Sequence, residues 1–232
     1  MKFEIKNRWS GNVQFACELS AEIADKSYGL RLGFAVREAI KADADLTGAD
    51  LTGADLTGAD LTDADLTGAD LTDAVLTDAV LTGADLTDAD LTDAVLTGAD
   101  LTGADLTDAV LTDADLTGAD LTGADLTGAH GVSAPIIPNI DDTILSNINA
   151  PGCSLDMSRW HVCGTTHCRA GWAVHLAGEG GKALEDRIGT GAAGALIYHA
   201  SAGYIPNFYA GDADAMEDIV AHATQQRGGM SP

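Results

Sequence analysis

The central part of the chain repeats a five-residue pattern in which two positions are apolar. Leucine falls at every fifth residue, with alanine two residues before it and threonine directly after it. A spacing of five matches neither the 3.6-residue period of a helix nor the two-residue period of a strand. If alanine and leucine both point inward, the outward residues of each repeat must turn the chain through one corner. Four corners close a coil of twenty residues, and successive coils stack at roughly 4.8 Å. The predicted core leucines are Leu46, Leu51, Leu56, Leu61, Leu66, Leu71, Leu76, Leu81, Leu86, Leu91, Leu96, Leu101, Leu106, Leu111, Leu116, Leu121 and Leu126.

This pattern, A-D-L-x-x, runs through residues 44–128 without a gap. It resembles the pentapeptide-repeat family, which implies a mainly β fold: a right-handed quadrilateral β-helix, or solenoid, with four pentapeptides per coil. The seventeen copies would form a rod roughly 20 Å long. Because threonine never changes at an outward position, the repeat predicts a designed consensus protein set between natural caps.

Two positions of the repeat vary. The fifth letter is Gly in ten copies and Asp in seven. Gly suits the positive φ of a type II turn, whereas Asp fits less easily and could favour another turn type. The second letter is Asp except at Val75, Val80, Val95 and Val110. These valines either relieve repulsion between stacked carboxylates or form a small patch for a partner. The threonine rows predict packing of β-branched side chains along each face, with an ice-binding array as the alternative.

The first 43 residues are expected to form a cap. Apolar and polar residues alternate on both sides of Ser10-Gly11-Asn12, which predicts a β-hairpin. Ser27 should cap a helix over residues 28–41, with Leu30, Phe34 and Ala35 on one face. This domain, 1–43, would cover the open edge of the repeat domain, 44–131.

Residues 132–232 are expected to form a mainly helical domain. After a linker marked by Pro135, Pro138 and Pro151, we predict helices near 166–178, 181–188, 190–201 and 212–226. The last helix would begin at Asp212 or Asp214. The residues predicted for its apolar face are Met216, Ile219, Val220 and Ala223.

One segment of this domain, WHVCGTTHCRAGWAVHLAG, resembles a module that follows pentapeptide repeats in bacterial and phage proteins. The resemblance implies no activity. Dimerisation within the family implies that a homodimer could form through this domain.

Six Cys and His side chains lie close together in the sequence of this domain. They are the candidate metal ligands Cys153, His161, Cys163, His167, Cys168 and His175. Zinc takes four N or S ligands, so it is one interpretation, and a Cys168–His175 nucleophile and base pair is another. The spacing of Cys163 and Cys168 is not that of a standard zinc knuckle, although the two could oxidise to a disulfide. We therefore predict packing residues beside Trp160 and Trp172, with no catalytic residue, metal or cofactor.

The charge of the chain belongs mainly to the repeat. The formal net charge is −24, and residues 44–128 hold twenty Asp with no Lys or Arg. Such a surface repels nucleic acid and anionic membranes and attracts a basic protein partner or cations. No run of eighteen apolar residues occurs, and MKFEIKNRW lacks a signal-peptide core, which predicts a cytoplasmic protein.

These features favour a non-enzymatic scaffold, a structural protein with an acidic surface. One alternative is DNA mimicry, because some pentapeptide-repeat proteins resemble B-DNA in width and charge and act on DNA gyrase. The acidic rod would then bind a DNA-binding protein such as gyrase. The other alternative is a metal-binding or enzymatic C-terminal domain, which would depend on the Cys and His cluster.

Overall fold

The computed structural model describes residues 1–131, 134–157, 161–163, 166–208 and 210–228. The chain divides into two units, which are described separately. The first contains Met1–Asp120 and Ala124–Val132, and the second contains Leu121–Gly123 and Ser133–Pro232. In the described part of the chain, no helix has the length and apolar character needed to cross a membrane.

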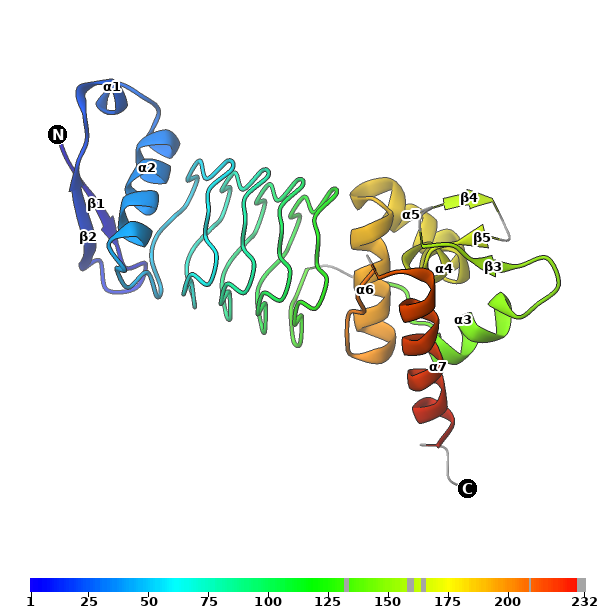
Figure 1. The fold of residues 1–232 in the computed structure, drawn as a ribbon. Coiled ribbons are helices and arrows are strands. Elements are labelled where there is room, and N and C mark those ends of the chain that lie inside the picture. Colours follow the sequence, from blue (N-terminus) through cyan, green and yellow to red (C-terminus); the bar gives the residue numbers. More distant parts are fainter. Residues whose placement is uncertain (132–133, 158–160, 164–165, 209, 229–232) are drawn as a thin grey trace. The chain divides into compact units, whose positions relative to one another are not determined.

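The first unit begins with the predicted hairpin and helix (Figure 1). Strands β1, Lys2–Lys6, and β2, Val13–Glu18, pair antiparallel, and a short helix, α1, spans Ala21–Ala24. Helix α2 spans Tyr28–Lys41, and the Ser27 side chain accepts the Leu30 N–H at its start. The hairpin, the helix bounds and the cap are confirmed.

The predicted apolar face of α2 was wrong in one part. Leu30 is exposed and Phe34 half-buried, whereas Leu32, Val36 and Ala39 are buried together with Ala35. The reason is the close approach of the helix to the first coil, where a Cβ on Gly33 would lie 1.8 Å from the Asp55 carbonyl oxygen. Glycine lets the two backbones touch, and that contact sets which face of the helix is turned inward.

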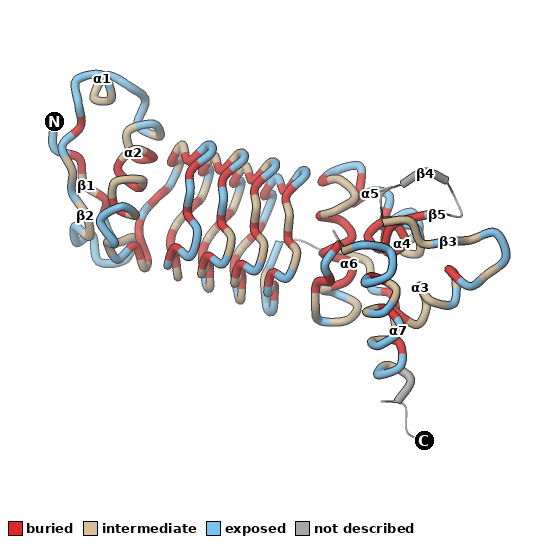
Figure 2. Tube along the Cα trace, viewed as in Figure 1, coloured by how far each residue is buried: buried red, intermediate tan, exposed pale blue. Residues whose placement is uncertain are grey.

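Isolated parallel bridges join the repeats to one another at a spacing of twenty residues. They begin with Asp50 and Asp70 and end with Val110 and His130. From Leu51 to Leu111, the leucine N–H of each repeat donates to the next coil, as from Leu51 to the Asp70 carbonyl oxygen at 2.8 Å. The leucines and nearly all the alanines are buried, as the alternating colours along the coils show (Figure 2). One coil therefore contains four pentapeptides, while its right-handed sense stays a prediction.

The fifth letter adopts one backbone conformation, whichever residue occupies it. The seven aspartates have φ between 54° and 58°, and the ten glycines have φ between 60° and 73°. The expectation of a different turn type for Asp was wrong, because Asp tolerates the left-handed region better than most side chains. The aspartates are Asp63, Asp73, Asp78, Asp88, Asp93, Asp108 and Asp113.

The N-terminal cap bonds to the free edge of the first coil. The Asp50 N–H donates to the Lys6 carbonyl oxygen at 2.7 Å, and the Asp55 N–H donates to that of Gly29 at 2.9 Å. Arg37 donates from its guanidinium to the carbonyl oxygens of Asp55 and Thr57. Backbone groups that a further coil would have paired are thus satisfied by β1 and α2.

The second unit is mainly helical. Its helices are α3, Ile140–Ile148; α4, Arg169–Leu176; α5, Gly178–Ile188; α6, Thr190–Ala202; and α7, Asp212–Gly228. Three short strands, β3 (Ser154–Leu155), β4 (His161–Cys163) and β5 (Thr166–His167), form a sheet in the order β3-β5-β4. Helix α3 packs on α7, while α4 packs on α5 and α6.

Part of this unit differs from the sequence prediction. The expected linker contains α3, whose buried Ile140, Ile144 and Ile148 recur at every fourth residue. The helix predicted from residue 166 begins instead at Arg169, because residues 166–167 pair as a strand. In α7, Val220 is exposed, and Ala215 takes its place beside the buried Ile219 and Ala223.

Candidate functional site

The best-defined polar site of the described residues is a buried cluster centred on Arg169, the first residue of α4. The Arg169 side chain is 1% exposed and that of Asp141, on α3, is 0% exposed. Arg169 Nη2 donates to Asp141 Oδ1 at 2.6 Å, and Nη1 pairs with Asp218 of α7. A buried charge is tolerated only when it is paired and hydrogen-bonded, and here one cation meets two carboxylates.

Two tyrosines complete the cluster. The Tyr198 hydroxyl accepts from Arg169 Nε at 2.8 Å, and the Tyr204 hydroxyl accepts from Nη2 at the same distance. Tyr204 in turn donates to Asp141 Oδ2 at 2.9 Å, and Gln226 donates to that oxygen at 3.1 Å. The guanidinium therefore joins α3, α4, α6 and α7 through one connected network.

The environment of the cluster keeps Arg169 and the two tyrosines protonated. Burial raises the pKa of Tyr198 and of Tyr204 above the ordinary value for a phenol. Burial alone would lower the pKa of Arg169, but the two tyrosines and Asp218 raise it overall. Neither tyrosine is thus suited to act as a general base near neutral pH, and the cluster is built to bind or to hold the helices together.

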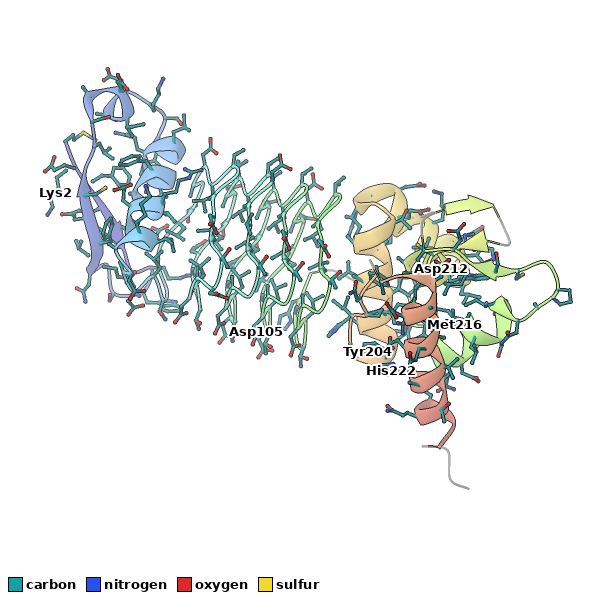
Figure 3. All side chains as sticks on the ribbon, in the orientation of Figure 1. Lys2, Asp105, Tyr204, Asp212, Met216 and His222 are labelled. Carbon is teal, nitrogen blue, oxygen red and sulfur yellow. The ribbon has the colours of Figure 1, made fainter. Side chains whose placement is uncertain are left out.

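His222 borders the cluster on α7. Its ring stacks on that of Tyr204 with the centroids 4.5 Å apart, and both side chains are labelled in Figure 3. Its Nδ1 lies 3.2 Å from Asp218 Oδ1. A pocket of about 470 Å³ lies beside these residues. Its lining includes Arg169, Tyr204, Asp218 and His222.

The Cys and His candidates from the sequence lie elsewhere. His167 ends β5 and is buried, with its ring 4.8 Å from those of Trp172 and His175. Cys153 is half-buried beyond α3. His161 and Cys163 belong to β4, but their side chains and the whole of Trp160 lie outside the described residues. Among the residues that the structure describes, no three His, Cys, Asp or Glu side chains gather as metal ligands.

Cys168 does not have the surroundings of a nucleophile. It was expected within a helix, facing His175 from the same side, but it is the N-cap of α4 and its sulfur accepts the Gly171 N–H at 3.3 Å. Burial raises the pKa of the Cys168 thiol, which disfavours the reactive thiolate. The candidate disulfide partner of Cys168, Cys163, has a side chain that lies outside the described residues.

The second-letter carboxylates of the repeat accept hydrogen bonds within their own turns. The second-letter aspartate accepts the N–H of the threonine two residues later, as Asp85 does from Thr87 at 2.9 Å. The threonine hydroxyl and N–H lower the pKa of Asp85, and similar bonds lower that of Asp60 and Asp115. The same bond occurs at Asp45, Asp50, Asp55, Asp60, Asp65, Asp70, Asp90, Asp100, Asp105, Asp115 and Asp125.

The valines interrupt these rows without forming one continuous patch. Val75 pairs with Val95, whereas Val80 pairs with Asp100 and Val110 lies between Asp90 and His130. Val80 is 37% exposed and the other three are less so. Only Val75 and Val95 therefore share a row.

Sequence analysis missed the Arg169 cluster. Its signal was a lone arginine within the apolar stretch CRAGWAVHL, together with a tyrosine within GALIYHA. A charge in the apolar stretch of a helix requires a partner, and this would have directed attention to the acidic residues of other segments. The identity of those partners, Asp141 and Asp218, depends on the packing of α3 and α7 against α4.

The first unit consists of five-residue repeats that are bridged at a spacing of twenty residues, with a hairpin and a helix on the first edge. A family model described as "Pentapeptide repeats" matches residues 42–78, 59–98, 74–113 and 89–128. The chain is similar to a pentapeptide repeat protein from the thylakoid lumen of Arabidopsis thaliana, with 35% identity over 44% of this chain and 72% of that chain, and a TM-score of 0.38.

It is also similar to a pentapeptide repeat protein from Nostoc PCC 7120, with 38% identity, 36% and 77% coverage and a TM-score of 0.24. QnrB1, a plasmid-mediated fluoroquinolone resistance protein, is 23% identical over 34% of this chain and 59% of its own, with a TM-score of 0.13. No curated protein matches the chain. From the repeat sequence and its identity to the first two relatives, the chain belongs to the pentapeptide repeat family.

Proposed function

We propose that the chain is a non-enzymatic scaffold in which the repeat is a stiff, acidic spacer. The observation that carries this proposal is the use of the outward side chains. The second-letter carboxylates bond to the threonines of their own turns, such as Asp85 to Thr87, and leucine and alanine fill the interior. These groups support the backbone of each coil and do not converge on a point where a substrate would bind.

A deletion of one whole coil tests the spacer role. Removing residues 81–100 keeps the five-residue pattern, and bridged residues twenty apart remain in register. We expect a cooperatively folded protein whose maximum dimension in small-angle X-ray scattering falls by roughly 5 Å, the rise of one coil. Removal of residues 81–98 is the matched control, since it breaks the pattern and should disrupt the repeat. An unfolded 81–100 deletion, or an unchanged dimension, would contradict the proposal.

The acidic rod also supports a second candidate, a mimic of DNA that binds a protein such as DNA gyrase. Twenty Asp over a rod of roughly 20 Å give about one charge per Å, which exceeds the one per ~1.7 Å of duplex DNA. The lowered pKa values of Asp60, Asp85 and Asp115, each set by bonds from a threonine, keep these carboxylates ionised. No described contact selects a particular partner.

A gyrase supercoiling assay across a salt series separates the two candidates. The scaffold proposal predicts no inhibition at physiological salt. The variant Asp60→Asn, Asp85→Asn and Asp115→Asn is the matched control, because asparagine can accept the same threonine bonds without the charge. Inhibition by the parent chain that the variant loses would replace the scaffold proposal with the mimic.

The comparisons match natural plant and cyanobacterial proteins and lend no support to a designed consensus origin. An enzymatic or metal-binding C-terminal domain finds no support in the described positions of Cys153, His167, Cys168 and His175. A homodimer through that domain would appear as twice the chain mass in light scattering after size exclusion.

A further inference from the structure

A pocket of about 470 Å³ in the second unit is not used by the scaffold role. It lies where the segment after α6 faces α7. Ile205, Pro206 and Ala215 form an apolar part of its lining, and all three are buried. Small-molecule sites in proteins have volumes of about 300–1,000 Å³ and combine apolar walls with a few polar groups, so both the size and the lining fit a small ligand.

The charge of the pocket is negative. Asp214 and Asp218 line it, and Asp141 lies behind Arg169. The positive charge of Arg169 is already matched, because its Nη1 pairs with Asp218 and its Nη2 with Asp141. One cation therefore faces three carboxylates, and these four groups alone carry a formal charge of about −2 at neutral pH.

The guanidinium has little capacity left for an anion. Nε donates to Tyr198, and both protons of Nη2 are used by Asp141 and Tyr204. Since Nη1 also donates to Asp218, at most one of the five N–H groups could reach a ligand. A carboxylate or phosphate is thus disfavoured by the surrounding charge and lacks the paired donors that bind it well.

Aromatic rings border the same pocket. Tyr204 and His222 stack with their centroids 4.5 Å apart, and the labelled side chains lie together in Figure 3. An aromatic face attracts a cation, and an aliphatic stem can be buried against apolar side chains such as Ile205 and Ala215. A ligand with a charged amine on a short hydrocarbon chain would satisfy both parts of the lining.

We propose that this pocket binds a primary alkylammonium group, with the ammonium beside Asp214 and Asp218 and the hydrocarbon stem against Ile205, Pro206 and Ala215. The proposal is independent of the scaffold role, because it concerns only the second unit. The group could come from a free alkylamine or from a lysine side chain of a protein, since both present an ammonium on a hydrocarbon stem.

The test uses n-butylammonium and the full chain, followed by amide NMR in 150 mM NaCl so that loose attraction to the acidic repeat is screened. We expect the amides of Ile205, Asp214 and Ala215 to shift with one saturable curve and a Kd of roughly 1–10 mM, as suits so small a ligand. The neutral isostere 1-butanol should bind at least fivefold more weakly. Equal binding of both compounds, or shifts confined to the repeat, would overturn the proposal.

A pair of charge variants on α7 locates the ammonium. Asp214→Asn should weaken n-butylammonium binding about fivefold, because a pocket carboxylate is removed while the exposed position keeps the helix intact. Glu217→Gln removes the same charge from an exposed residue of α7 that is absent from the pocket lining and should leave Kd unchanged. Equal weakening in both variants would show a general charge effect and refute a specific site.

A second ligand distinguishes the two sources of the amine. Nα-acetyl-lysine N-methylamide carries the butylammonium on a peptide backbone. Binding at least as tight as that of n-butylammonium supports a lysine side chain of a partner, whereas binding that is tenfold weaker supports a free amine. Failure of both compounds to bind would refute the site.

Discussion

The left-handed aspartates of the repeat store a small amount of strain that substitution should release. Asp93 has φ 57°, and its row contains Asp73 in the coil before and Asp113 in the coil after. Replacement by Gly, Asn and Ala separates backbone strain from charge. Gly removes both, Asn removes the charge alone, and Ala removes the charge while adding strain.

The magnitudes follow from the backbone and the spacing of the coils. A left-handed conformation costs a residue with a side chain roughly 1–2 kcal/mol, with Asp near the low end. Each neighbouring carboxylate at roughly 5 Å repels by about 0.8 kcal/mol in water before screening, which leaves a few tenths in salt. Glycine loses about 0.5–1 kcal/mol through the greater freedom of the unfolded chain. Asp93→Gly should therefore stabilise the repeat by about 0.5–1 kcal/mol, and Asp93→Asn by about 0.5 kcal/mol.

Urea unfolding measures these differences when the repeat is followed alone. The methyl NMR signals of Leu91 and Leu96, both buried beside the substituted turn, report the repeat separately from the C-terminal unit. We expect the order of stability Gly, Asn, then the parent Asp, with Ala about 1 kcal/mol below Asn. The advantage of Asn should vanish in 1 M NaCl. An Ala variant as stable as Gly would refute the strain explanation.

Three further substitutions test other contacts. Arg169→Met should destabilise the C-terminal unit by about 3–5 kcal/mol, because it leaves Asp141 charged and buried. We expect the near-ultraviolet circular dichroism to be lost while the amide NMR signals of the repeat persist. Retention of both signals would contradict this. Thr87→Val should raise the pKa of Asp85 toward the ordinary value. Because the folded pKa of Asp85 is lowered, its hydrogen bonds contribute stability above about pH 4 that is lost as the pH falls through that lowered pKa. NMR titration of Asp85 measures the shift, and an unchanged pKa would exclude the Thr87 hydroxyl as a cause. Arg8→Ala should destabilise the N-terminal cap by about 1–2 kcal/mol, because Arg8 donates to the Ala69 carbonyl oxygen at 3.2 Å and pairs with Asp70. Faster hydrogen exchange of the Asp50 amide would measure this loss. The control Lys26→Ala should leave that exchange rate unchanged.

The N-terminal cap shows how far local sequence patterns extend. The serine cap and the bounds of α2 could be predicted because they depend on residues within one or two turns of the helix. The buried face of α2 could not, since it is set by the approach of Gly33 to the Asp55 carbonyl oxygen. The position of the exposed Trp9 also depends on residues that are distant in the sequence. It is 69% exposed, and its ring lies so close to Gly48 and Gly68 that a Cβ at either would meet it within 2.6 Å.

In the C-terminal unit, local sequence patterns located three helices but not the polar cluster. Helices α5, α6 and α7 could be located from apolar periodicity and caps, to within about three residues of their ends. Helix α3 was missed because the prolines on both sides suggested a linker. The Arg169 cluster was missed because its members come from four helices far apart in the sequence, and no local pattern links Asp141 to Asp218.

The sequence by itself determined the coil of the repeat, because a period of five allows alanine and leucine to face inward only if each repeat turns one corner. Since every repeat packs against nearly identical repeats, the five-residue pattern also specifies the contacts between coils. The tertiary structure alone decided which face of α2 covers the first coil, which acids neutralise Arg169 and where a pocket opens. Those outcomes depend on contacts between residues that are distant in the chain. A buried charge needs partners, but the packing of the helices decides which residues they are, and no local sequence pattern specifies that packing.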